Sequence, residues 1–266
     1  MKISVLMLSI RPQNLVKCYK AISEACKKHE WEVIIPSPYL IPEELMTAGN
    51  VRFIHTYACP TTAMQIGVMN ACGEFVYNIT DDGLLLPNVI DDNIDLIDDY
   101  KTILNMRYDE AVLDPYTLEL FKESHEHFDM DYWRAGHHPD LRLNGINPNW
   151  GISMHYFMHT NYFLELGGLD CKYEYTTYPI MDLMFRAQLD GAKMVHSRDT
   201  AFYCSHLPHY AGDHQPVHDS QTGPDYQRWI QEYHFKTERP INIDYNNWKD
   251  HNQTWTRRFQ ALRLKP

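Results

Sequence analysis

Short apolar runs alternate with stretches of helical periodicity over the first hundred residues of the chain. Residues 3–8 form an apolar run that is typical of a buried parallel strand, and a second strand is expected at residues 32–35. Between them, apolar side chains recur at i, i+4, i+7 and i+11 over residues 13–29, which predicts an amphipathic helix. The chain therefore begins in the β-α-β order that builds a mostly parallel sheet flanked by helices.

The alternation continues beyond this point, with strands expected at residues 51–55, 75–79 and 102–106 and a helix at residues 61–71. A further helix is expected at residues 88–100, because Ile90, Ile94 and Ile97 fall on one helical face. The five aspartates of that stretch lie on the other face, so they indicate a solvated surface rather than a metal cluster.

Two adjacent carboxylates, Asp81 and Asp82, directly follow the strand expected at residues 75–79. In an open α/β sheet, ligands bind at the carboxyl ends of the strands. Paired carboxylates at that edge suit a divalent cation held against a diphosphate. Asp-Asp-Gly is also ordinary turn chemistry, so these residues alone leave both interpretations open.

The composition limits the class of protein. With 266 residues, 44% of them hydrophobic, the chain can bury one sizeable core and carry a C-terminal extension. It has no run of about 18 apolar residues and no signal-peptide pattern, so we expect a cytoplasmic protein without a transmembrane segment. The six cysteines lack C-x-x-C spacing, which favours reduced, packed thiols over a zinc ribbon or a disulfide scaffold. The net charge of -11 disfavours a passive nucleic-acid track but leaves a local basic patch open.

The middle of the chain, residues 108–149, is rich in aromatic residues, histidine and aspartate but has no clear periodicity. Its histidines have no Cys or acidic partner at a fixed spacing, so the pattern does not favour a metal site. We expect this irregular segment to line a substrate site or to cover the sheet.

A second informative block lies at residues 163–206. The sequence Gly167-Gly168-Leu169-Asp170 predicts a tight turn, and Asp182 opens a run that predicts a short helix ended by Gly191. An aspartate at the amino end of a helix can simply satisfy free amides and the helix dipole. Asp182 by itself therefore does not identify a catalytic site.

Taken in order, these motifs resemble those of the inverting nucleotide-sugar glycosyltransferases with the GT-A fold, especially the large family 2 group. The resemblance covers roughly residues 1–210 and is carried by the order and spacing of the motifs. They are Ser9-Ile10-Arg11-Pro12, then Ala63, Gly67, Ala71 and Gly73-Glu74, then Thr80-Asp81-Asp82-Gly83 with Pro87, then Gly167-Gly168-Leu169-Asp170, then Met181-Asp182 with Arg186 and Gly191, and finally His206.

The resemblance implies a GT-A fold, in which a mixed, mostly parallel sheet is flanked by helices. It implies a glycosyltransferase domain at residues 1–210, with a nucleotide-binding half (1–107) and an acceptor and catalytic half (108–210). A helical or irregular extension packed on that domain is expected at residues 211–266.

The implied reaction moves a sugar, hexosyl or related, from a nucleoside-diphosphate sugar to an acceptor hydroxyl by an inverting single displacement. It depends on a divalent metal, Mn²⁺ or Mg²⁺. Asp82 and His206 would hold the metal, and Asp182 would take the proton from the acceptor. The implied donor contacts are Ser9, Arg11, Ser37, Asp81 and Asp82.

Three positions depart from the family's pattern. Thr80 replaces the first acid of its D-x-D motif, and Met181 replaces the glutamate of its E-D pair. Pro36-Ser37-Pro38 stands where the second strand usually ends in an aspartate that pairs with the donor's base, so uracil recognition does not carry over. These departures leave two alternatives, a nucleotidyltransferase-type nucleotide-binding enzyme and a non-catalytic descendant that binds a saccharide or a partner protein.

The acceptor is expected to be a saccharide, because the aromatic segment lies where GT-A enzymes usually contact their acceptors. A basic C-terminal stretch, residues 257–265, could instead hold an anionic acceptor, either a nucleic acid with a hydroxylated base or a lipid-linked phosphate. The other interpretation is that this tail packs back on the domain through Trp255, Phe259 and Leu262. The expected acceptor contacts are Trp133, Trp150 and Gly151.

Overall fold

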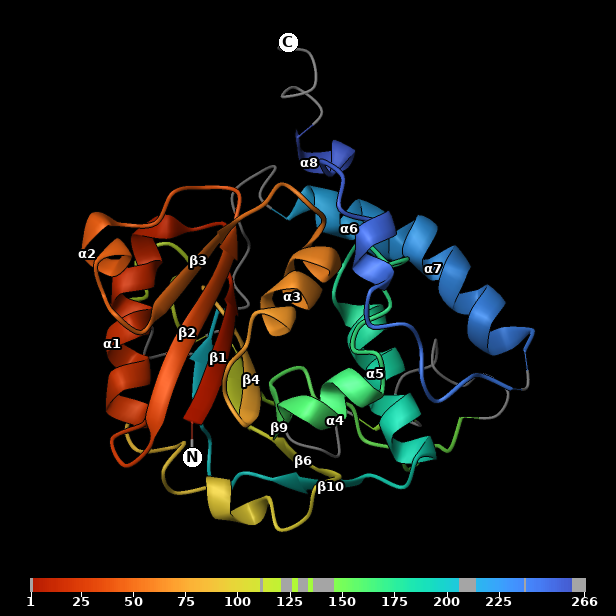
Figure 1. Ribbon diagram of the computed structural model, residues 1–266, viewed down its shortest axis with the longest axis horizontal. Coiled ribbons are helices and arrows are strands. Elements are labelled where there is room, and N and C mark those ends of the chain that lie inside the picture. The colour runs from red at the N-terminus through yellow and green to blue at the C-terminus, as the bar shows by residue number, and fades with distance from the viewer. Residues whose placement is uncertain are drawn as a thin grey trace.

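The computed structural model describes residues 2–110, 112–120, 126–128, 134–135, 146–205, 214–236 and 238–259. A seven-stranded sheet forms its centre (Figure 1). In spatial order the strands are β10 (Lys193–His196), β6 (Thr102–Asn105), β9 (Tyr156–His159), β4 (Phe75–Thr80), β1 (Lys2–Leu8), β2 (Glu30–Ser37) and β3 (Val51–His55). β9 pairs antiparallel with β4 and β6, and the other pairs are parallel. The mostly parallel α/β sheet predicted from the sequence is confirmed.

Helices cover both faces of this sheet (Figure 1). Neighbouring strand residues point to opposite faces, so Val5 and Leu6 of β1 belong to different cores. Val5 packs with apolar side chains of α1 (Leu15–Ala25) and α2 (Glu43–Met46). Leu6 packs with those of α3 (Pro60–Met69), α4 (Thr160–Glu165) and α5 (Thr177–Leu189). Since both faces are covered, the strands read as apolar runs in the sequence.

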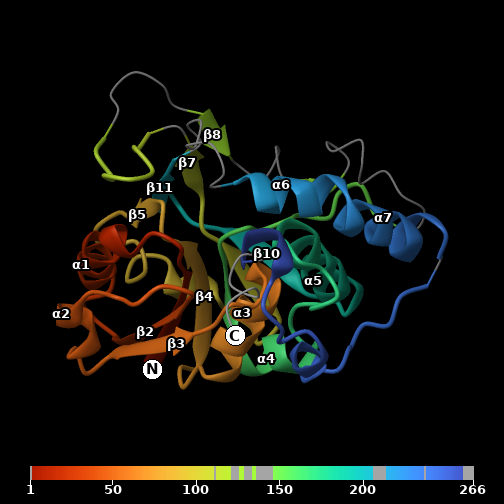
Figure 2. The same cartoon turned by 90° about the horizontal axis from the view of Figure 1, so that it is seen from above.

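A second, four-stranded sheet lies beside the first (Figure 2). Its order is β5 (Gly83–Leu85), β11 (Phe202–Cys204), β7 (Tyr108–Glu110) and β8 (Glu126–Phe128). β5 and β7 follow β4 and β6 closely in the chain. The chain therefore passes from the carboxyl ends of two central strands, β4 and β6, directly into strands of the small sheet.

The helix predicted for residues 88–100 does not form, and that prediction was wrong. Just before this stretch, β5 pairs antiparallel with β11, and the Leu86 N–H donates to the Ala201 carbonyl at 2.9 Å. The following residues form turns and a short 3₁₀ turn, η2 (Ile94–Leu96), while Ile90 stays buried. The isoleucines face the core as predicted, but the backbone is held by the end of α1, because the Asn88 and Ile90 amides donate to the Glu24 and Ala25 carbonyls at 2.9 and 3.1 Å.

Three boundaries also differ from the predicted ones. α1 ends at Ala25 rather than near residue 29, and β2 already begins at Glu30. β2 continues through Pro36, because the Pro36 carbonyl still accepts a hydrogen bond from the Ser9 N–H at 3.1 Å. A proline removes one donor from a strand but leaves its acceptor in place.

The C-terminal part comprises α6 (Gln215–Thr222), α7 (Pro224–Trp229), a π-helical turn (Ile230–His234), the 3₁₀ turn η6 (Asn247–Asp250) and α8 (Thr256–Phe259). Trp229 packs against Phe185 of α5, and Trp255 and Phe259 are buried with Cys59 and Val217. The predicted domain boundary at residue 210 lies outside the described residues. Within the described ranges, no helix is both long enough and apolar enough to cross a membrane.

Candidate active site

The carboxyl ends of β1 and β4 meet at the point where the strand order reverses. From β1 the chain proceeds through β2 and β3 on one side, and β4 then joins the other side of β1. Ligands of open α/β sheets bind at such a switch point. The residues directly after these strands, Ser9 to Arg11 and Asp81 with Asp82, come together there.

Asp81 is buried and its carboxylate is fully engaged by the turn that follows β1. One oxygen accepts hydrogen bonds from the Ser9 hydroxyl (2.9 Å) and from the Ile10 and Arg11 amides (2.8 and 2.6 Å). The other accepts from the Arg11 guanidinium at 2.7 Å. Burial raises the pKa of Asp81, while the Arg11 charge opposes that shift. Asp81 therefore fixes the shape of the edge and offers no open oxygen to a ligand.

Asp82 is the acid of the pair that reaches the ligand space. Its side chain keeps 15% of its surface exposed and lies 3.5 Å from the Arg11 guanidinium. It lines a cavity of about 480 Å³, within the size range of small-molecule sites. The sequence placed both acids at this edge, and the tertiary contacts assign them different roles.

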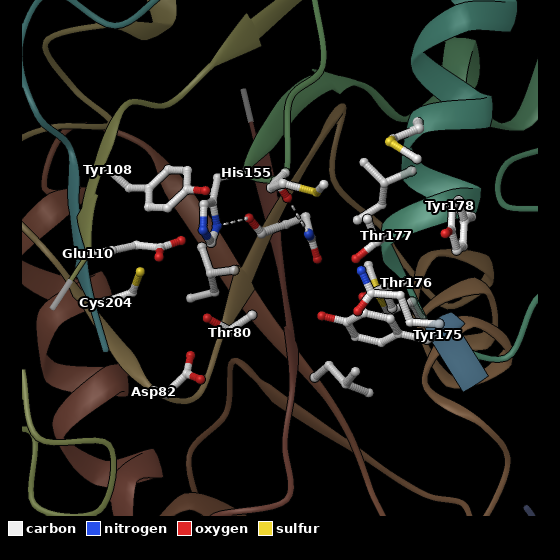
Figure 3. A pocket seen from close by; sticks show the side chains of 18 of the residues that line it. Thr80, Asp82, Tyr108, Glu110, His155, Tyr175, Thr176, Thr177, Tyr178 and Cys204 are labelled. Atoms are coloured by element: carbon white, nitrogen blue, oxygen red, sulfur yellow. Dashed lines mark hydrogen bonds between the residues drawn. The ribbon is translucent and has the colours of Figure 1, made fainter. Parts of the chain in front are cut away.

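The cavity has four walls that come from distant parts of the chain (Figure 3). β1 and β4 contribute Leu8, Asn78 and Thr80, and the small sheet contributes Tyr108, Glu110 and Cys204. The chain entering α5 supplies the facing wall, and α6 supplies one side. The residues of these last two walls are Tyr175, Thr176, Thr177, Tyr178, Ile180, Met181, His218 and Gln221.

Glu110 and Asp82 are the two carboxylates that line the cavity among the described residues. Burial comes first in raising the pKa of Tyr175, and the charges of Asp82 and Glu110 raise it further. The pKa of the Cys204 thiol is raised by burial and then by the same two acids. The charges of Asp82 and Glu110 thus act on side chains on both sides of the cavity, Tyr175 and Cys204. This arrangement suits a cationic or metal-bound ligand.

His155 forms part of the cavity lining and is neutral. Its Nδ1 lies 3.3 Å from the Asn78 carbonyl, so that nitrogen carries the proton and donates it. Burial lowers the pKa of His155 to about 4. Sequence reasoning missed both His155 and Glu110, because neither belongs to a motif and both are brought here by strand pairing.

Asp182 does not line the cavity. The sequence placed it at the amino end of its helix, but α5 begins at Thr177 and Asp182 lies in the middle of it, fully buried. One oxygen accepts from the Arg186 guanidinium at 2.8 Å, and the other contacts the Tyr233 hydroxyl and the Arg239 guanidinium. Burial alone would raise the pKa of Asp182, but the charges of Arg186 and Arg239 outweigh it and lower that pKa. The predicted role as general base is not supported by this placement.

Two of the predicted acceptor contacts, Trp150 and Gly151, are likewise absent from the cavity lining. Trp150 packs against Phe185 of α5, with ring centroids 5.7 Å apart. The Gly151 backbone exchanges hydrogen bonds of 3.0 and 2.8 Å with the Gln188 side chain. These residues cover α5 instead. Trp133, the third expected contact, and His206, the expected metal ligand, lie outside the described residues.

A smaller slot of about 40 Å³ adjoins the cavity and shares Leu8 with it. Ser9 and Ser37, two of the predicted donor contacts, line the slot at the carboxyl ends of β1 and β2. Thr56 lines it at the carboxyl end of β3. Trp255, Arg258 and Phe259 form its other side.

The described residues offer a cation only part of a site. Among the described residues, no three His, Cys, Asp or Glu side chains gather as a ready-made metal centre. Asp82 offers one cavity-facing carboxylate, and Mg²⁺ is commonly bound by one or two carboxylates together with substrate phosphates. The donor set therefore fits a cation that is held jointly with a diphosphate.

Known structures resemble this chain in fold. A scan against protein-family models finds no match, and neither does a sequence comparison with curated proteins. TarS residues 1–349 from S. aureus, crystallised with UDP, aligns at TM-score 0.56 and 15% identity over 78% of this chain and 61% of its own. The same TarS region with UDP-GlcNAc aligns at TM-score 0.56 and 13% identity over 100% of this chain and 76% of its own. GalNAc-T7 with UDP, GalNAc and Mn²⁺ aligns at TM-score 0.61 and 13% identity over 98% of this chain and 56% of its own.

The chain thus spans 61% of the TarS structure in its UDP complex and 56% of the GalNAc-T7 structure. At these identities the likeness concerns the fold. The resemblance drawn from the motifs is confirmed at that level: the chain has the GT-A fold of the nucleotide-sugar glycosyltransferases.

Proposed function

We propose that this protein transfers a sugar from a nucleoside-diphosphate sugar to an acceptor hydroxyl. The observation that carries the proposal is the cavity at the switch point, into which Asp82 reaches while Asp81 and Arg11 fix the edge beneath it. That arrangement provides a place for a diphosphate at the edge where α/β folds bind nucleotides. The structural neighbours were crystallised with UDP or UDP-GlcNAc, which supports a nucleotide sugar as donor.

The donor is proposed to span both the larger cavity and the smaller slot. The nucleoside would lie over the ends of β1 and β2, near Ser9 and Ser37, and the sugar would enter the larger cavity. The diphosphate would then lie near Asp82, where the Arg11 guanidinium also contributes positive charge. Arg11 is held in place by Asp81, so it is oriented before the donor arrives.

Asp82 is proposed to hold a divalent cation, Mn²⁺ or Mg²⁺, together with the diphosphate. Such a cation would neutralise the charge that develops on the leaving nucleoside diphosphate. The presence of Mn²⁺ in the GalNAc-T7 crystal supports this choice. His206 stays a proposed ligand.

The proton of the acceptor needs a base within hydrogen-bonding reach. Because Asp182 is buried between two arginines, we propose Glu110 as that base. The acceptor oxygen would bond to the anomeric carbon, the bond from that carbon to the diphosphate would break, and Glu110 would receive the acceptor proton. One displacement of this kind inverts the anomeric configuration.

The second candidate is a non-catalytic binding protein. Three features favour it: Thr80 and Met181 replace family acids, and Asp182 is engaged in ion pairs rather than exposed. Such a protein would bind a saccharide without turnover of any nucleotide sugar. Its ligand could equally be a partner protein. For the enzyme, the acceptor is proposed to be a saccharide, with a nucleic acid carrying a hydroxylated base or a lipid-linked phosphate as alternatives.

The first test measures UDP binding by calorimetry with and without Mn²⁺, in the wild type and in Asp82→Asn. We expect Mn²⁺-dependent binding in the wild type and a loss of about 10- to 100-fold in the variant, because a contact to a charged group contributes about 1.5–3 kcal/mol. Asp95→Asn, an exposed acid paired with Arg198, is the matched control and should bind normally. A screen of nucleotide sugars with the same assay would identify the donor.

The outcomes separate the candidates. Equal Mn²⁺-dependent affinity in Asp82→Asn and wild type would refute the metal assignment. A wild type that binds oligosaccharides but no nucleoside diphosphate, and hydrolyses or transfers no nucleotide sugar, would establish the binding protein instead.

A further inference from the structure

The slot at the nucleoside end of the site has one wall made by strand ends and one made by the C-terminal segment. Ser9, Ser37 and Thr56 belong to the first wall. Residues 255–259, here called the strap, supply Trp255, Arg258 and Phe259 to the second. Figure 1 shows α8 above the edge of the sheet, next to the ends of β3 and α3. A segment from the far end of the chain therefore lies over the strand ends of the first sixty residues.

The slot is too small for a nucleobase in this structure. Its volume of about 40 Å³ is about a twelfth of the 480 Å³ of the larger cavity. The larger cavity has ample room, but it adjoins the slot only through Leu8. A donor that reaches from the cavity to the end of β2 must displace one wall. The strand wall belongs to the core of the sheet, whereas the strap does not.

The strap contacts the rest of the described chain through the ion pair of Arg257 with Glu174 and through Tyr57. The Trp255 N–H donates to the Tyr57 carbonyl at 2.8 Å, and the Phe259 ring meets the Tyr57 ring edge-on at 5.3 Å. Trp255 and Phe259 form a small apolar cluster with Cys59 and Val217 that is separate from the two cores of the sheet. Small clusters of this kind open at lower free energy than the main core.

Electrostatics also favour a nucleotide at this place. The strap carries Arg257 and Arg258 and contains no acid. Arg257 bonds Glu174 at 2.5 Å and lies outside the slot lining, whereas Arg258 lines the slot. An anionic diphosphate at this place would meet Arg258 on the strap side, while on the strand side Arg11 is already paired with Asp81 and lies 3.5 Å from Asp82.

We infer that residues 255–259 are the movable wall of the nucleoside site. The strap is closed in the unliganded protein, and it lifts from Tyr57 when the nucleoside of the donor occupies the slot. This inference rests on the proposed function, since it takes the ligand to be a nucleoside diphosphate. Binding then includes the opening of the strap, so the apparent affinity is reduced by the fraction of molecules that are open.

The test loosens the strap from outside the slot. Tyr57→Ala removes the ring that Phe259 contacts but changes no residue of the slot lining. Edge-to-face aromatic contacts contribute enough to shift an equilibrium by about 2- to 10-fold, so UDP with Mn²⁺ should bind that much more tightly and associate faster. Arg257→Gln should act in the same direction with a smaller effect, and it serves if Tyr57→Ala is unstable. Phe235→Ala, which removes an exposed aromatic ring outside the strap, is the matched control.

Hydrogen exchange gives an independent readout. At saturating UDP, the amide of Trp255 should exchange faster, because its hydrogen bond to the Tyr57 carbonyl opens with the strap, whereas the Phe259 amide bonds the Trp255 carbonyl within the strap. The Ile243 amide, bonded to the Leu166 carbonyl at 3.2 Å, should stay protected. Unchanged protection at Trp255 together with unchanged affinity in Tyr57→Ala would overturn the inference while leaving the proposed function intact. If the wild type and both loosened variants bind none of the nucleoside diphosphates in the screen, UDP included, the proposed function is overturned as well.

Discussion

Replacement of Glu110 by Gln is expected to slow sugar transfer by about 10²- to 10⁴-fold, the usual loss when a positioned general base is removed. Donor binding should change little, because the nucleoside and diphosphate are proposed to lie nearer Ser9 and Asp82. The measurement is single-turnover transfer from the donor found in the binding screen, with UDP affinity determined in parallel. Product stereochemistry from the same reaction would test the inverting displacement.

Asp109 offers a matched control for this experiment. It precedes Glu110 on β7, so its side chain points to the opposite face of that strand, where it contacts the Thr200 hydroxyl at 3.3 Å. Asp109→Asn removes one acid from the same strand without touching the cavity lining. Near-normal turnover in Glu110→Gln would exclude it as the base. A loss in His218→Gln under those conditions would move the role to α6, which also borders the cavity.

Replacement of Asp182 by Asn is expected to destabilise the fold by about 3–5 kcal/mol, the range for breaking a buried ion pair from one side. The change would leave Arg186 and Arg239 without their common counter-ion. Urea unfolding followed by fluorescence would measure the loss. Asp190→Asn at the end of the same helix, where the aspartate pairs with a half-exposed Lys101, should cost about 1 kcal/mol or less.

The pH dependence gives a second test of the same residue. Because the folded-state pKa of Asp182 is lowered, its stabilisation is fully present above the unfolded-state pKa of about 3.9 and is lost as the pH falls through the lower folded value. Asp182→Asn should therefore unfold with a weaker acid dependence than the wild type. A variant that is as stable as the wild type but inactive would restore Asp182 as the catalytic base.

Asp182, Arg186 and Arg239 form a cluster of buried ion pairs that connects three parts of the chain. Arg186 also donates to the carbonyls of Leu166 and Gly168, next to the Gly-Gly turn. Arg239 pairs with Asp170 of that turn at 3.1 Å and thereby ties the C-terminal part to it. The motif residues found in the sequence are thus neighbours in space, and their shared role here is to join α5, the turn and the C-terminal segment.

The sequence by itself determined the central architecture. Strands buried on both faces must be apolar throughout, and helices that cover a sheet must carry an apolar stripe. The local sequence pattern was therefore sufficient to predict β1, β4, β6 and α1. The position of Asp81 and Asp82 at a strand end follows from the same patterns. The order of these two acids and the Gly-Gly turn along the chain was enough to indicate the GT-A fold, because that order is a property of the sequence alone.

Only the tertiary structure decided which of these side chains face the ligand space. The direction of a side chain depends on helix phase and on partners far along the chain. α5 begins at Thr177, five residues before Asp182, and the Asp182 side chain meets Arg239. The Ser9 to Arg11 turn binds Asp81, whereas Asp82 faces the cavity. Glu110 and the strap reach the site through contacts that no local pattern encodes. Local periodicity fixes which residues are buried, whereas long-range pairing fixes what each buried or half-buried polar group meets.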